Sequence, residues 1–575
     1  MSGGIDPVTL EVLRHALLGI AEEMNANLVR TAYSPNIKER RDCSSALFDP
    51  YGRMVAQAES IPVHLGAMPF SVKEAMARFP DLAPGDTIVL NDPFAGGAHL
   101  PDLTFVTPVF HDGRLEALVA NRAHHADIGG KTPGSVSGDA TEIFQEGLRL
   151  PPVRLWRRDE PDDDLLRVIL ANVRTPRERR GDLRAQRAAN ETGRRRLLEL
   201  VARIGADRLS AAIAAILGYS ERRMAAAIEA IPDGSYAFSD VLDDDGISPG
   251  PIRIAAAVRV TGNRLCVDFS GTDPQTAGPV NAVYAVTASA VYYTIRAFTD
   301  PDIPPNEGCY RPIEVIAPAG TVVNARPPAA VVGGNLETSQ RIVDVLVGAL
   351  DQALPGRGIA ACQGTMNNLT LGGIDPRSGE AYTLYETIGG GAGAGPTWDG
   401  ADGVHTHMTN TLNTPIEALE GAYPLRVTRY ELRADTGGAG RHRGGLGIRR
   451  DLTAIGHRAR VSLLADRRRT APYGVVGGTE GAMGNDVLIL PDGTVRHLPG
   501  KGSVVLEPGT TLSVQTPGGG GYGPAEARDP DAVRRDLREG RISPQRARDD
   551  YGLVPGDGTT ERRPDPGLRD AERPA

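Results

Sequence analysis

The spacing of apolar residues changes along this chain, and that change is the feature that most constrains its fold. Residues 165–231 are dominated by alanine, leucine, arginine and glutamate at helical spacing, which predicts two helices separated near Gly205. From Gly234 to about Asp273 the apolar period becomes two, which is typical of an antiparallel β region. Beyond Leu354 glycine is abundant and apolar runs are short, so the C-terminal third is predicted to be β-rich. The fold class that follows is a mixed, multi-domain α+β structure.

Elements elsewhere in the chain follow from the same signals. The N-terminus is expected to start with an amphipathic helix, because Asp6 can cap it and Pro7 suits its first turn. Residues 44–56 alternate around an Asp-Pro-Tyr-Gly turn and predict a hairpin. Further helices are expected over 72–79, 286–299, 336–354 and, as a charged surface helix, 531–551. Short strands are expected at 87–90, 103–110, 115–121, 383–388, 427–432, 447–454, 458–464, 486–490 and 503–506.

The length of 575 residues exceeds the roughly 250–300 at which a single core stops growing, so several packed units are expected. The shifts in composition divide the chain into an N-terminal α/β region over 1–232, a central α+β region over 233–355 and a glycine-rich β region over 356–524. The remaining segment, 525–575, is expected to hold the charged helix and then a tail rich in proline, aspartate and arginine that is predicted to be disordered.

Composition excludes several classes of function. A net charge of −9 and a pI near 5.8 do not favour a nucleic-acid or anionic-membrane partner. No run of 18 apolar residues and no basic-then-apolar leader is present, so a cytoplasmic protein is expected. The four cysteines are far apart and form no CxxC pair, so neither a thiolate zinc site nor a disulfide framework is indicated.

Two short segments hold the densest set of potential metal ligands, NDPFAGGAHLPD (91–102) and NRAHHADIGG (121–130). Three of the 11 histidines lie in these two segments: His99, His124 and His125. In the first segment His99 and Asp102 stand three apart across Pro101, which stiffens the loop. Imidazole with carboxylate suits zinc, manganese or iron. For this tetrad alone, a polar turn in which His99 bonds a carbonyl and Asp102 caps the backbone is an equal alternative.

The second segment favours metal binding or acid–base chemistry over that alternative. His124 and His125 are adjacent on an extended segment, so their side chains point to opposite sides and only one readily faces a given site. The other can act as an acid–base group or orient a ligand. Upstream, Glu39 and Asp42 lie in NIKERRDCS, which reads first as a solvated charge run and second as a connection that could deliver a carboxylate to the site.

Other conspicuous stretches give weaker indications. The glycine-rich runs 389–396, 437–447 and 516–524 lack a GxxxxGK[ST] pattern and are interpreted as tight β connections and close-packing sites, so no ATP site is expected in this chain. His405 and His407, with Asn410 and Asn413, are a candidate for polar substrate contact, although simple exposure explains them equally well. There is no GxSxG motif and no evident Cys–His pairing, so serine or cysteine nucleophilic catalysis is not predicted.

With these segments in hand, the chain resembles the hydantoinase B/oxoprolinase family. The resemblance spans residues 6–524 and rests on segments that occur in a fixed order along the chain. They are NIKERRDCSSALFD, IPVHLGAMP, GDTIVLNDPFAGGAHLPDLTFVTPVF, AHHADIGG, DFSGTDPQTAGPVN, GGNLETSQR and TPGGGGYGP. The family includes the B subunit of N-methylhydantoinase, the C-terminal half of 5-oxoprolinase and, more distantly, the large subunits of acetone and acetophenone carboxylases.

The resemblance implies a reaction shared between two polypeptides or domains. A hydantoinase A-type ATPase partner would use ATP to phosphorylate the substrate oxygen, and the B-type chain would complete the reaction, in a hetero-oligomer. It also implies a divalent metal held by a His-x-x-Asp pair, a later histidine and an upstream glutamate. In this sequence those positions are His99, Asp102, His124 and Glu39.

The remaining polar residues take supporting roles in this expectation. The resemblance leaves His125 and Asp127 as acid–base or ligand-orienting groups and Asp92 as a supporting carboxylate. Asn281 and Gln340 are expected to bind ring amide groups of the substrate. The leading hypothesis is therefore hydrolysis of a small cyclic amide activated by the partner. The alternatives are a subunit of an ATP-dependent ketone carboxylase and a non-catalytic scaffold for the ATPase.

Overall fold

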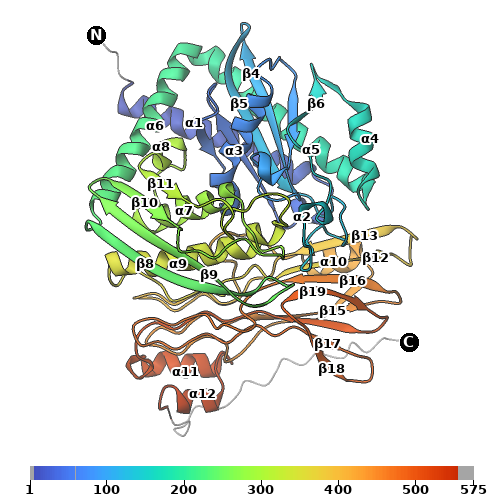
Figure 1. Ribbon diagram of the computed structural model, residues 1–575, viewed down its shortest axis with the longest axis vertical. Coiled ribbons are helices and arrows are strands. Elements are labelled where there is room, and N and C mark those ends of the chain that lie inside the picture. The colour runs from blue at the N-terminus through green and yellow to red at the C-terminus, as the bar shows by residue number, and fades with distance from the viewer. Residues whose placement is uncertain (1–4, 59, 554–575) are drawn as a thin grey trace, which may run out of the picture.

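Figure 1 shows the computed structural model, which describes residues 5–58 and 60–553. Over these residues the strands form four sheets, of seven, four, four and five strands, and the long helices pack against the first two sheets. The N-terminal sheet and its helices occupy one end of the molecule and the C-terminal sheets occupy the other (Figure 1). The predicted α+β class is confirmed.

The first sheet is antiparallel throughout and contains the predicted hairpin and the strands expected at 87–90, 103–110 and 115–121. Its spatial order is β2 (Met54–Gln57), β1 (Cys43–Phe48), β5 (Arg114–His124), β4 (Asp102–His111), β3 (Thr87–Leu90), β6 (Val153–Arg157) and β7 (Glu160–Pro161). β1 and β2 are the hairpin expected at 44–56, and β4 and β5 meet around the turn at 111–113. The sheet therefore carries both histidine-bearing segments at one end of neighbouring strands.

Helices cover both faces of this sheet. α1 (Pro7–Thr31) and α5 (Pro176–Ile204) pack against each other on one face, and α3 (Pro62–Arg78) lies on the other. Successive residues of β1 enter different cores, because side chains alternate across a strand: Leu47 packs in the core with α1, and Phe48 packs in the core with α3. α3 begins at Pro62 and continues through Pro69, so it is longer than the helix predicted over 72–79.

The helix boundaries follow the capping signals in the sequence. Asp6 Oδ1 accepts a hydrogen bond of 3.0 Å from the Thr9 amide and caps α1 as predicted. Gly205 separates α5 from α6 (Ala206–Glu229) in a left-handed conformation with φ of 84°, which an L side chain rarely adopts. The predicted break between two helices is therefore confirmed, and its cause is the backbone freedom of glycine.

The central region contains the second sheet and two buried helices. Its order is β11 (Ile313–Ile316), β10 (Arg264–Asp268), β9 (Pro249–Thr261) and β8 (Gly234–Asp244), antiparallel as predicted except that β11 joins β10 in parallel. α9 (Ser339–Ala353) packs on β8 and β9, and α7 (Tyr284–Thr299) packs on both α9 and α3. The helix expected over 336–354 is preceded by a π-helical segment, η3 (Gly334–Thr338).

The C-terminal third is two antiparallel sheets with a common apolar core, which confirms the predicted β-rich region. One sheet has the order β13 (Ala381–Glu386), β12 (Asn368–Ile374), β16 (Ala459–Leu464) and β19 (Lys501–Leu506). The other has the order β14 (Leu425–Leu432), β15 (Ile448–Ala454), β20 (Thr511–Gln515), β17 (Val487–Ile489) and β18 (Val495–His497). The strands that the sequence did not predict, β12, β18 and β20, are short or contain glycine.

Shorter elements complete the described chain. The predicted helix over 531–551 is two helices, α11 (Pro530–Arg538) and α12 (Pro544–Asp549), because the chain turns at Gly540 with φ of 71°. The disordered tail expected at the C-terminus lies outside the described residues. The other short elements are α2 (Pro35–Lys38), α4 (Asp163–Ala171), α8 (Glu307–Tyr310), α10 (Ile416–Ala422), η1 (Pro93–Ala95), η2 (Ile143–Gln145) and η4 (Ala525–Ala527).

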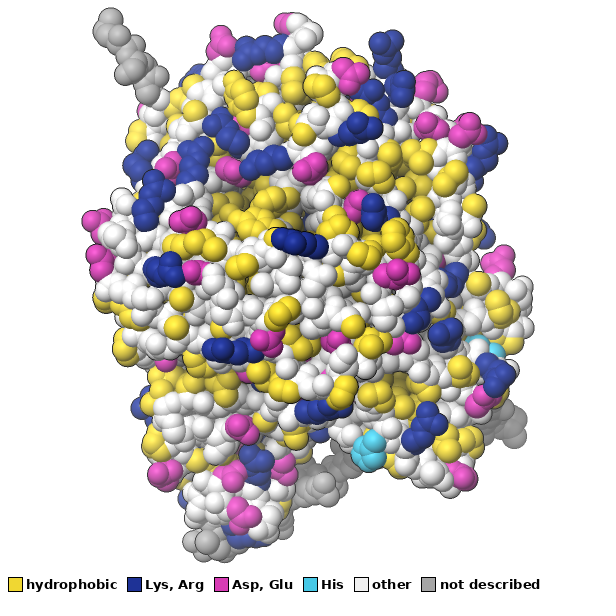
Figure 2. Space-filling model, viewed as in Figure 1, with side chains coloured by type: hydrophobic (Ala, Val, Ile, Leu, Met, Phe, Trp, Pro, Cys, Tyr) yellow, Lys and Arg dark blue, Asp and Glu magenta, His cyan; other side chains and the backbone are white. Residues whose placement is uncertain are grey.

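The surface agrees with the charge balance of the sequence. Figure 2 shows acidic and basic side chains interspersed over one face of the molecule, with no extended patch of one sign. Within the described residues, no helix is long and apolar enough to span a membrane.

The three glycine-rich stretches pack against one another, backbone to backbone. A Cβ added at Gly391 would lie 2.1 Å from the Gly445 carbonyl oxygen and 2.2 Å from the Gly519 nitrogen. A Cβ at Gly519 would lie 2.0 Å from the Ala392 carbonyl oxygen. Real Cβ atoms do not approach so closely, so these positions require glycine. The interpretation of the stretches as close-packing sites is confirmed.

We expect the substitution Gly519→Ala to destabilise the protein by about 1–3 kcal/mol, because the added methyl group overpacks a backbone contact that cannot move alone. The control is Gly19→Ala on α1, where a Cβ meets nothing within 4 Å, so higher helix propensity should leave stability unchanged or slightly raised. Thermal unfolding of the two variants measures both effects. Equal melting temperatures would contradict the packing argument.

Candidate metal centre

The pairing of β4 with β5 brings the two histidine-bearing segments together. β4 begins at Asp102 and β5 ends at His124, and these two residues are direct partners in the antiparallel register. The turn before β4 is closed by the Asp102 amide, which donates to the His99 carbonyl at 3.1 Å. Asp102, His99 and His124 therefore lie at one end of the same strand pair. Rigid strands of this kind hold the side chains of a site in fixed positions.

A row of buried polar side chains runs through this point. Ser44 Oγ lies 3.1 Å from His64 Nδ1, and His64 Nε2 lies 3.3 Å from Asp102 Oδ1. On the other side of the carboxylate, Asp102 Oδ2 lies 3.2 Å from His99 Nε2. The ring centroids of His99 and His124 are 5.0 Å apart. All three imidazoles and the carboxylate are at most 2% exposed.

The electrostatics of the row favour an ionised Asp102 and a neutral His124. Burial alone would raise the pKa of Asp102, but the adjacent His64 and His99 outweigh it and hold the pKa well below its ordinary value. Burial lowers the pKa of His124 well below its ordinary value, and His99 beside it adds to the effect. A carboxylate and a neutral imidazole are the forms of these side chains that bind metal ions.

Two polar atoms of the row have no hydrogen-bond partner among the described residues. They are His99 Nδ1 and His124 Nε2, whereas the two carboxylate oxygens of Asp102 contact only the imidazoles of His64 and His99. A buried polar atom without a partner is unfavourable by about 1–3 kcal/mol, so two such imidazole nitrogens beside a buried carboxylate indicate a missing ligand. The donor set of two or three imidazoles and one or two carboxylates fits zinc, manganese or iron.

The donor atoms do not yet converge on one point. In the described part of the chain, no group of three or more His, Cys, Asp or Glu side chains is already arranged to hold a metal ion. The composition, burial and unpartnered atoms of the row fit a metal, whereas its present side-chain rotamers do not. Binding would require these side chains to turn toward a common centre.

A small cavity of about 20 Å³ adjoins the row, which is room for about one water molecule. Its walls come from three of the regions that the sequence analysis distinguished, 1–232, 233–355 and 356–524. The lining residues are Asp42, Ile61, Val63, His64, His124, Asn335, Leu336, Met366, Tyr385, Thr387, Met408 and Thr409.

The carboxylate that reaches this cavity from the α2–β1 connection is Asp42, and Glu39 does not line it. Glu39 caps the C-terminus of α2 and is partly exposed. The Asp42 carbonyl accepts from the His124 amide at 3.0 Å, which ties the connection to the end of β5. Burial raises the pKa of Asp42, and the charges of Arg40 and His64 oppose that shift.

The residues expected to act as acid–base groups have structural partners away from the cavity. His125 points toward α5, where its Nε2 lies 2.9 Å from Gln186 Oε1, and burial lowers its pKa to about 4. Asp127 forms an ion pair of 2.7 Å with Arg174. Asp92 caps η1 by accepting from the Phe94 amide at 3.0 Å and pairs with Arg149. The structure thus separates His124 and His125 onto opposite sides, as adjacent residues on a strand must be.

The two residues expected to bind a ring amide are also engaged within the protein. The Asn281 side-chain amide donates to three carbonyls, those of Thr276, Gly278 and Ala330, at 2.8–3.0 Å. Gln340 Nε2 donates to the Thr406 carbonyl at 3.0 Å. Neither side chain lines the cavity. Asn281 instead fixes the loop on which the glycines before Asn335 pack closely.

Sequence reasoning did not assign four residues that surround the row. His64 lies on α3, Asn335 on η3 has its Nδ2 3.3 Å from His99 Nε2, and Tyr385 on β13 stacks on His124 at a centroid distance of 4.2 Å. Asp42 is the fourth. His64 lies within IPVHLGAMP. Because histidine is scarce in the chain, the residue type alone could have marked His64 as a candidate site residue. Nothing in the sequence marked Asn335 or Tyr385, because only the fold brings these two residues close to the row.

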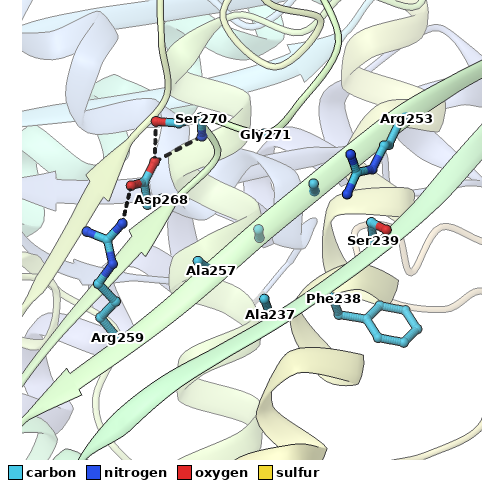
Figure 3. Close-up of a pocket in the computed structure, with 11 residues that line it drawn as sticks. Ala237, Phe238, Ser239, Arg253, Ala257, Arg259, Asp268, Ser270 and Gly271 are labelled. Carbon is cyan, nitrogen blue, oxygen red and sulfur yellow. Dashed lines mark hydrogen bonds and ion pairs between the residues drawn. The ribbon is translucent and has the colours of Figure 1, made fainter.

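A larger groove, of about 610 Å³, lies on the open face of the second sheet (Figure 3). It is lined mainly by alanine and serine from β8 and β9 and by the loop after β10. The charged pair within it, Arg259 and Asp268, is satisfied by a 2.6 Å contact and by Ser270. None of the residues predicted to form the site lines this groove. The groove is larger than the cavity beside the row, but it contains none of the candidate metal ligands. We take the smaller cavity as the candidate site, because His124, with its unpartnered Nε2, lines it and lies beside His99 and Asp102.

Comparisons with known proteins agree with the resemblance. The chain is 41% identical to an uncharacterised protein of Methanocaldococcus jannaschii over 95% of its length and 96% of that protein. It is 35% identical to caprolactamase subunit beta of Pseudomonas jessenii over 96% of each chain. It is 38% identical to 5-oxoprolinase 1 of Arabidopsis thaliana over 90% of its own length, but it spans only 42% of that longer protein.

The solved structures show the same fold. The crystal structure of ATP-dependent caprolactamase from Pseudomonas jessenii superposes with a TM-score of 0.90, at 33% identity, covering 97% of this chain and 98% of that one. A nucleotide-free acetone carboxylase has a TM-score of 0.89 at 20% identity, covering 96% of this chain and 80% of that one, which is a likeness of fold. Residues 6–525 match the family described as Hydantoinase B/oxoprolinase, and this chain is a member of that family.

Proposed function

We propose that this protein is one subunit of an ATP-dependent cyclic-amide hydrolase of the hydantoinase/5-oxoprolinase type. The observation that carries the proposal is the buried row of His64, Asp102, His99 and His124 with its unpartnered donor atoms. Its setting is a chain that aligns over nearly its whole length with caprolactamase subunit beta. The substrate class we infer is a small cyclic amide.

His99, Asp102 and His124 would hold a divalent metal ion, with Asp42 as the further carboxylate. Such an ion supplies Lewis-acid chemistry, by polarising a carbonyl or lowering the pKa of bound water. The chain itself supplies the rest. His64 and Asn335 orient Asp102 and His99, and burial of the row limits its contact with bulk water, which strengthens the charge interactions inside. His64, beside Asp102 and Ser44, is placed to hold a proton at Nε2 or Nδ1.

We infer an ATPase partner of the hydantoinase A type, which would use the ATP that this chain has no recognisable loop to bind. This chain spans about two-fifths of 5-oxoprolinase 1, so in that relative the matching region is joined to a longer stretch of polypeptide. The likeness to caprolactamase subunit beta over 96% of each chain supports a separate partner chain and hence a hetero-oligomer as the active form.

Two alternatives are weaker. A carboxylase subunit would use the same row, but the likeness to acetone carboxylase is at 20% identity and supports the fold alone. A scaffold for the ATPase would have no need of unpartnered imidazole nitrogens on His99 and His124 in its core, since each lowers stability by about 1–3 kcal/mol.

The purified chain should contain zinc, manganese or iron close to one ion per chain, and the double variant His99→Ala/Asp102→Ala should lose it, because two of the donors are removed. Elemental mass spectrometry measures both. The matched control is His497→Ala, which removes an exposed histidine of β18 and should leave the metal content unchanged. A well-folded parent without metal, even after reconstitution, would overturn the assignment.

Two amide substitutions identify the fourth ligand. Asp42→Asn should weaken metal binding by at least about tenfold, because it replaces a carboxylate on the cavity wall with a neutral group. Glu39→Gln should have no effect, because Glu39 does not line the cavity. Competition with a chromogenic chelator gives both affinities. If Glu39→Gln weakened metal binding and Asp42→Asn did not, Glu39 would be the fourth ligand.

Activity separates an enzyme from a scaffold. With the ATPase partner, ATP and a cyclic amide such as 5-oxoproline or hydantoin, His99→Ala should lower ring opening by at least about 100-fold while the complex still forms. Chromatographic measurement of the ring-opened acid and size-exclusion chromatography of the complex provide the two readouts. A scaffold would retain full activity in the same variant.

A further inference from the structure

The edge strand β14 is open to solvent over its second half. It lies at one end of the five-stranded sheet, and among the described residues β15 is the one strand that pairs with it. Its first half meets α10, where the Val427 amide donates to Glu420 Oε1 at 2.9 Å. Residues 428–432 are all exposed, with Tyr430 at 46% and Leu432 at 47%. An exposed strand edge of this kind is a template on which another strand can pair.

The backbone groups that point outward from this edge belong to Tyr430 and Leu432. Along an antiparallel strand, successive residues point their N–H and C=O groups to opposite sides. The Arg433 amide donates to the Gly447 carbonyl at 2.8 Å, so Arg433 and every second residue before it face β15, as far back as the bulge at 427–429. Tyr430 and Leu432 therefore point their backbone groups away from β15, where no other segment of the described chain bonds to them.

The charged side chains beside these groups follow an order that a second copy of the strand completes. Arg429 and Glu431 lie on one face of β14, 3.4 Å apart, and their side chains are 54% and 52% exposed. Across the sheet Arg429 is in register with Asp451, and Glu431 is in register with Arg449. Positive and negative charges thus alternate both along β14 and between β14 and β15. Because the order along β14 is positive and then negative, the same strand running in the opposite direction presents the complementary order.

We propose that this edge pairs with the same edge of a second copy of the chain, antiparallel about a two-fold axis at Tyr430. The outward N–H and C=O groups of Tyr430 then bond to those of its counterpart. Arg429 lies opposite Glu431 of the second copy, and Glu431 lies opposite its Arg429, so two attractive pairs form across the junction. The contact is isologous, as in most closed dimers, and it joins the two five-stranded sheets into one continuous sheet.

The charges also select this register over the neighbouring ones. A slip of two residues in either direction would set Arg429 opposite Arg429 or Glu431 opposite Glu431, and like charges directly opposite are destabilising. A parallel arrangement in register would set both pairs of like charges opposite each other. Charged side chains on an edge strand commonly prevent unwanted pairing, and here they exclude the alternatives while they favour the two-fold arrangement.

The other face of the edge carries apolar side chains. Tyr430 and Leu432 lie there, and Tyr430 OH donates to Asn413 Oδ1 at 3.3 Å, next to Leu412, which is 50% exposed. Two-fold pairing brings Tyr430 beside its counterpart and removes part of this apolar surface from water. The residues that form the metal row and line its cavity all lie outside β14, so the inference does not rest on the proposed function.

Two charge-reversal variants and their mixture test the proposal by sedimentation analysis of the full chain alone. The parent should show a monomer–dimer equilibrium between about 1 and 300 µM, because a contact made by one strand edge is small. Arg429→Glu and Glu431→Arg each set like charges opposite each other at both pairs, so each variant alone should dimerise at least about tenfold more weakly. Mixed one to one, the two variants should form a heterodimer as stable as the parent dimer, because every pair is again of opposite sign.

The control is Arg496→Glu, which makes the same charge change on β18, the exposed strand at the opposite edge of the same sheet, and should leave the dimer intact. A parent that stays monomeric throughout the range, or single variants that dimerise as well as the parent, would overturn the proposal. So would a mixture that stays as monomeric as its components. If the parent is monomeric alone and both single variants lose binding of an ATPase partner, the edge belongs to that partner and the second copy is excluded.

A cysteine at the two-fold axis provides an independent measurement. Hydrogen-bonded antiparallel partners have Cα atoms about 5.5 Å apart, which is within the range that a disulfide spans. In a Cys266→Ser background, which removes the one native cysteine that is not buried, Tyr430→Cys should form a disulfide-linked dimer under mild oxidation. Val495→Cys on β18, at a position that is 54% exposed, should stay unlinked on a non-reducing gel. Equal cross-linking of the two variants, or none at position 430, would contradict the proposed axis.

Discussion

The antiparallel register that sets Asp102 opposite His124 is the constraint on which the candidate site depends. Because side chains alternate across a strand, a slip of one residue would carry His124 to the α5 side and bring His125 to the cavity. Backbone bonds prevent the slip: the His124 amide donates to the Asp42 carbonyl and the His125 amide to the Pro101 carbonyl. The same bonds join the His-x-x-Asp turn, the end of β5 and the start of β1 into one unit.

Buried arginines connect this unit to the C-terminal half of the molecule. Arg40 is fully buried, and its guanidinium donates to the Tyr385 carbonyl at 2.8 Å and to the Leu412 carbonyl at 3.1 Å. A buried cation must satisfy its donors, so the chain segments that accept from it cannot move independently. Tyr385 stacks on His124, and residues 408 and 409 line the cavity. Arg40, near the start of the chain, therefore holds in place two walls of the cavity that come from distant parts of the sequence.

The sequence predicted what is local and missed what the fold assembles. His99, Asp102 and His124 lie within 26 positions, so proximity along the chain indicated one cluster, and strand periodicity separated His124 from His125. Asp42, His64, Asn335 and Tyr385 come from four separate elements, and no spacing rule relates them. Glycine at 391 and 519 could be recognised as a packing residue, but the contact between the two stretches required the structure. The Asn281 amide serves the loop beneath η3, and its expected role in binding a ring amide stays a prediction.

The size of the metal cavity has a kinetic consequence. With about 20 Å³ it admits one water and no organic ring, so any substrate must bind to a form in which the walls have separated. Apparent affinity then falls by the fraction of molecules that are open: an open population of about 1 in 100 weakens it about 100-fold, or roughly 2.7 kcal/mol. A partner chain that stabilised the open form would therefore lower the Michaelis constant without touching the substrate, and a metal analysis of the isolated chain would not detect its influence.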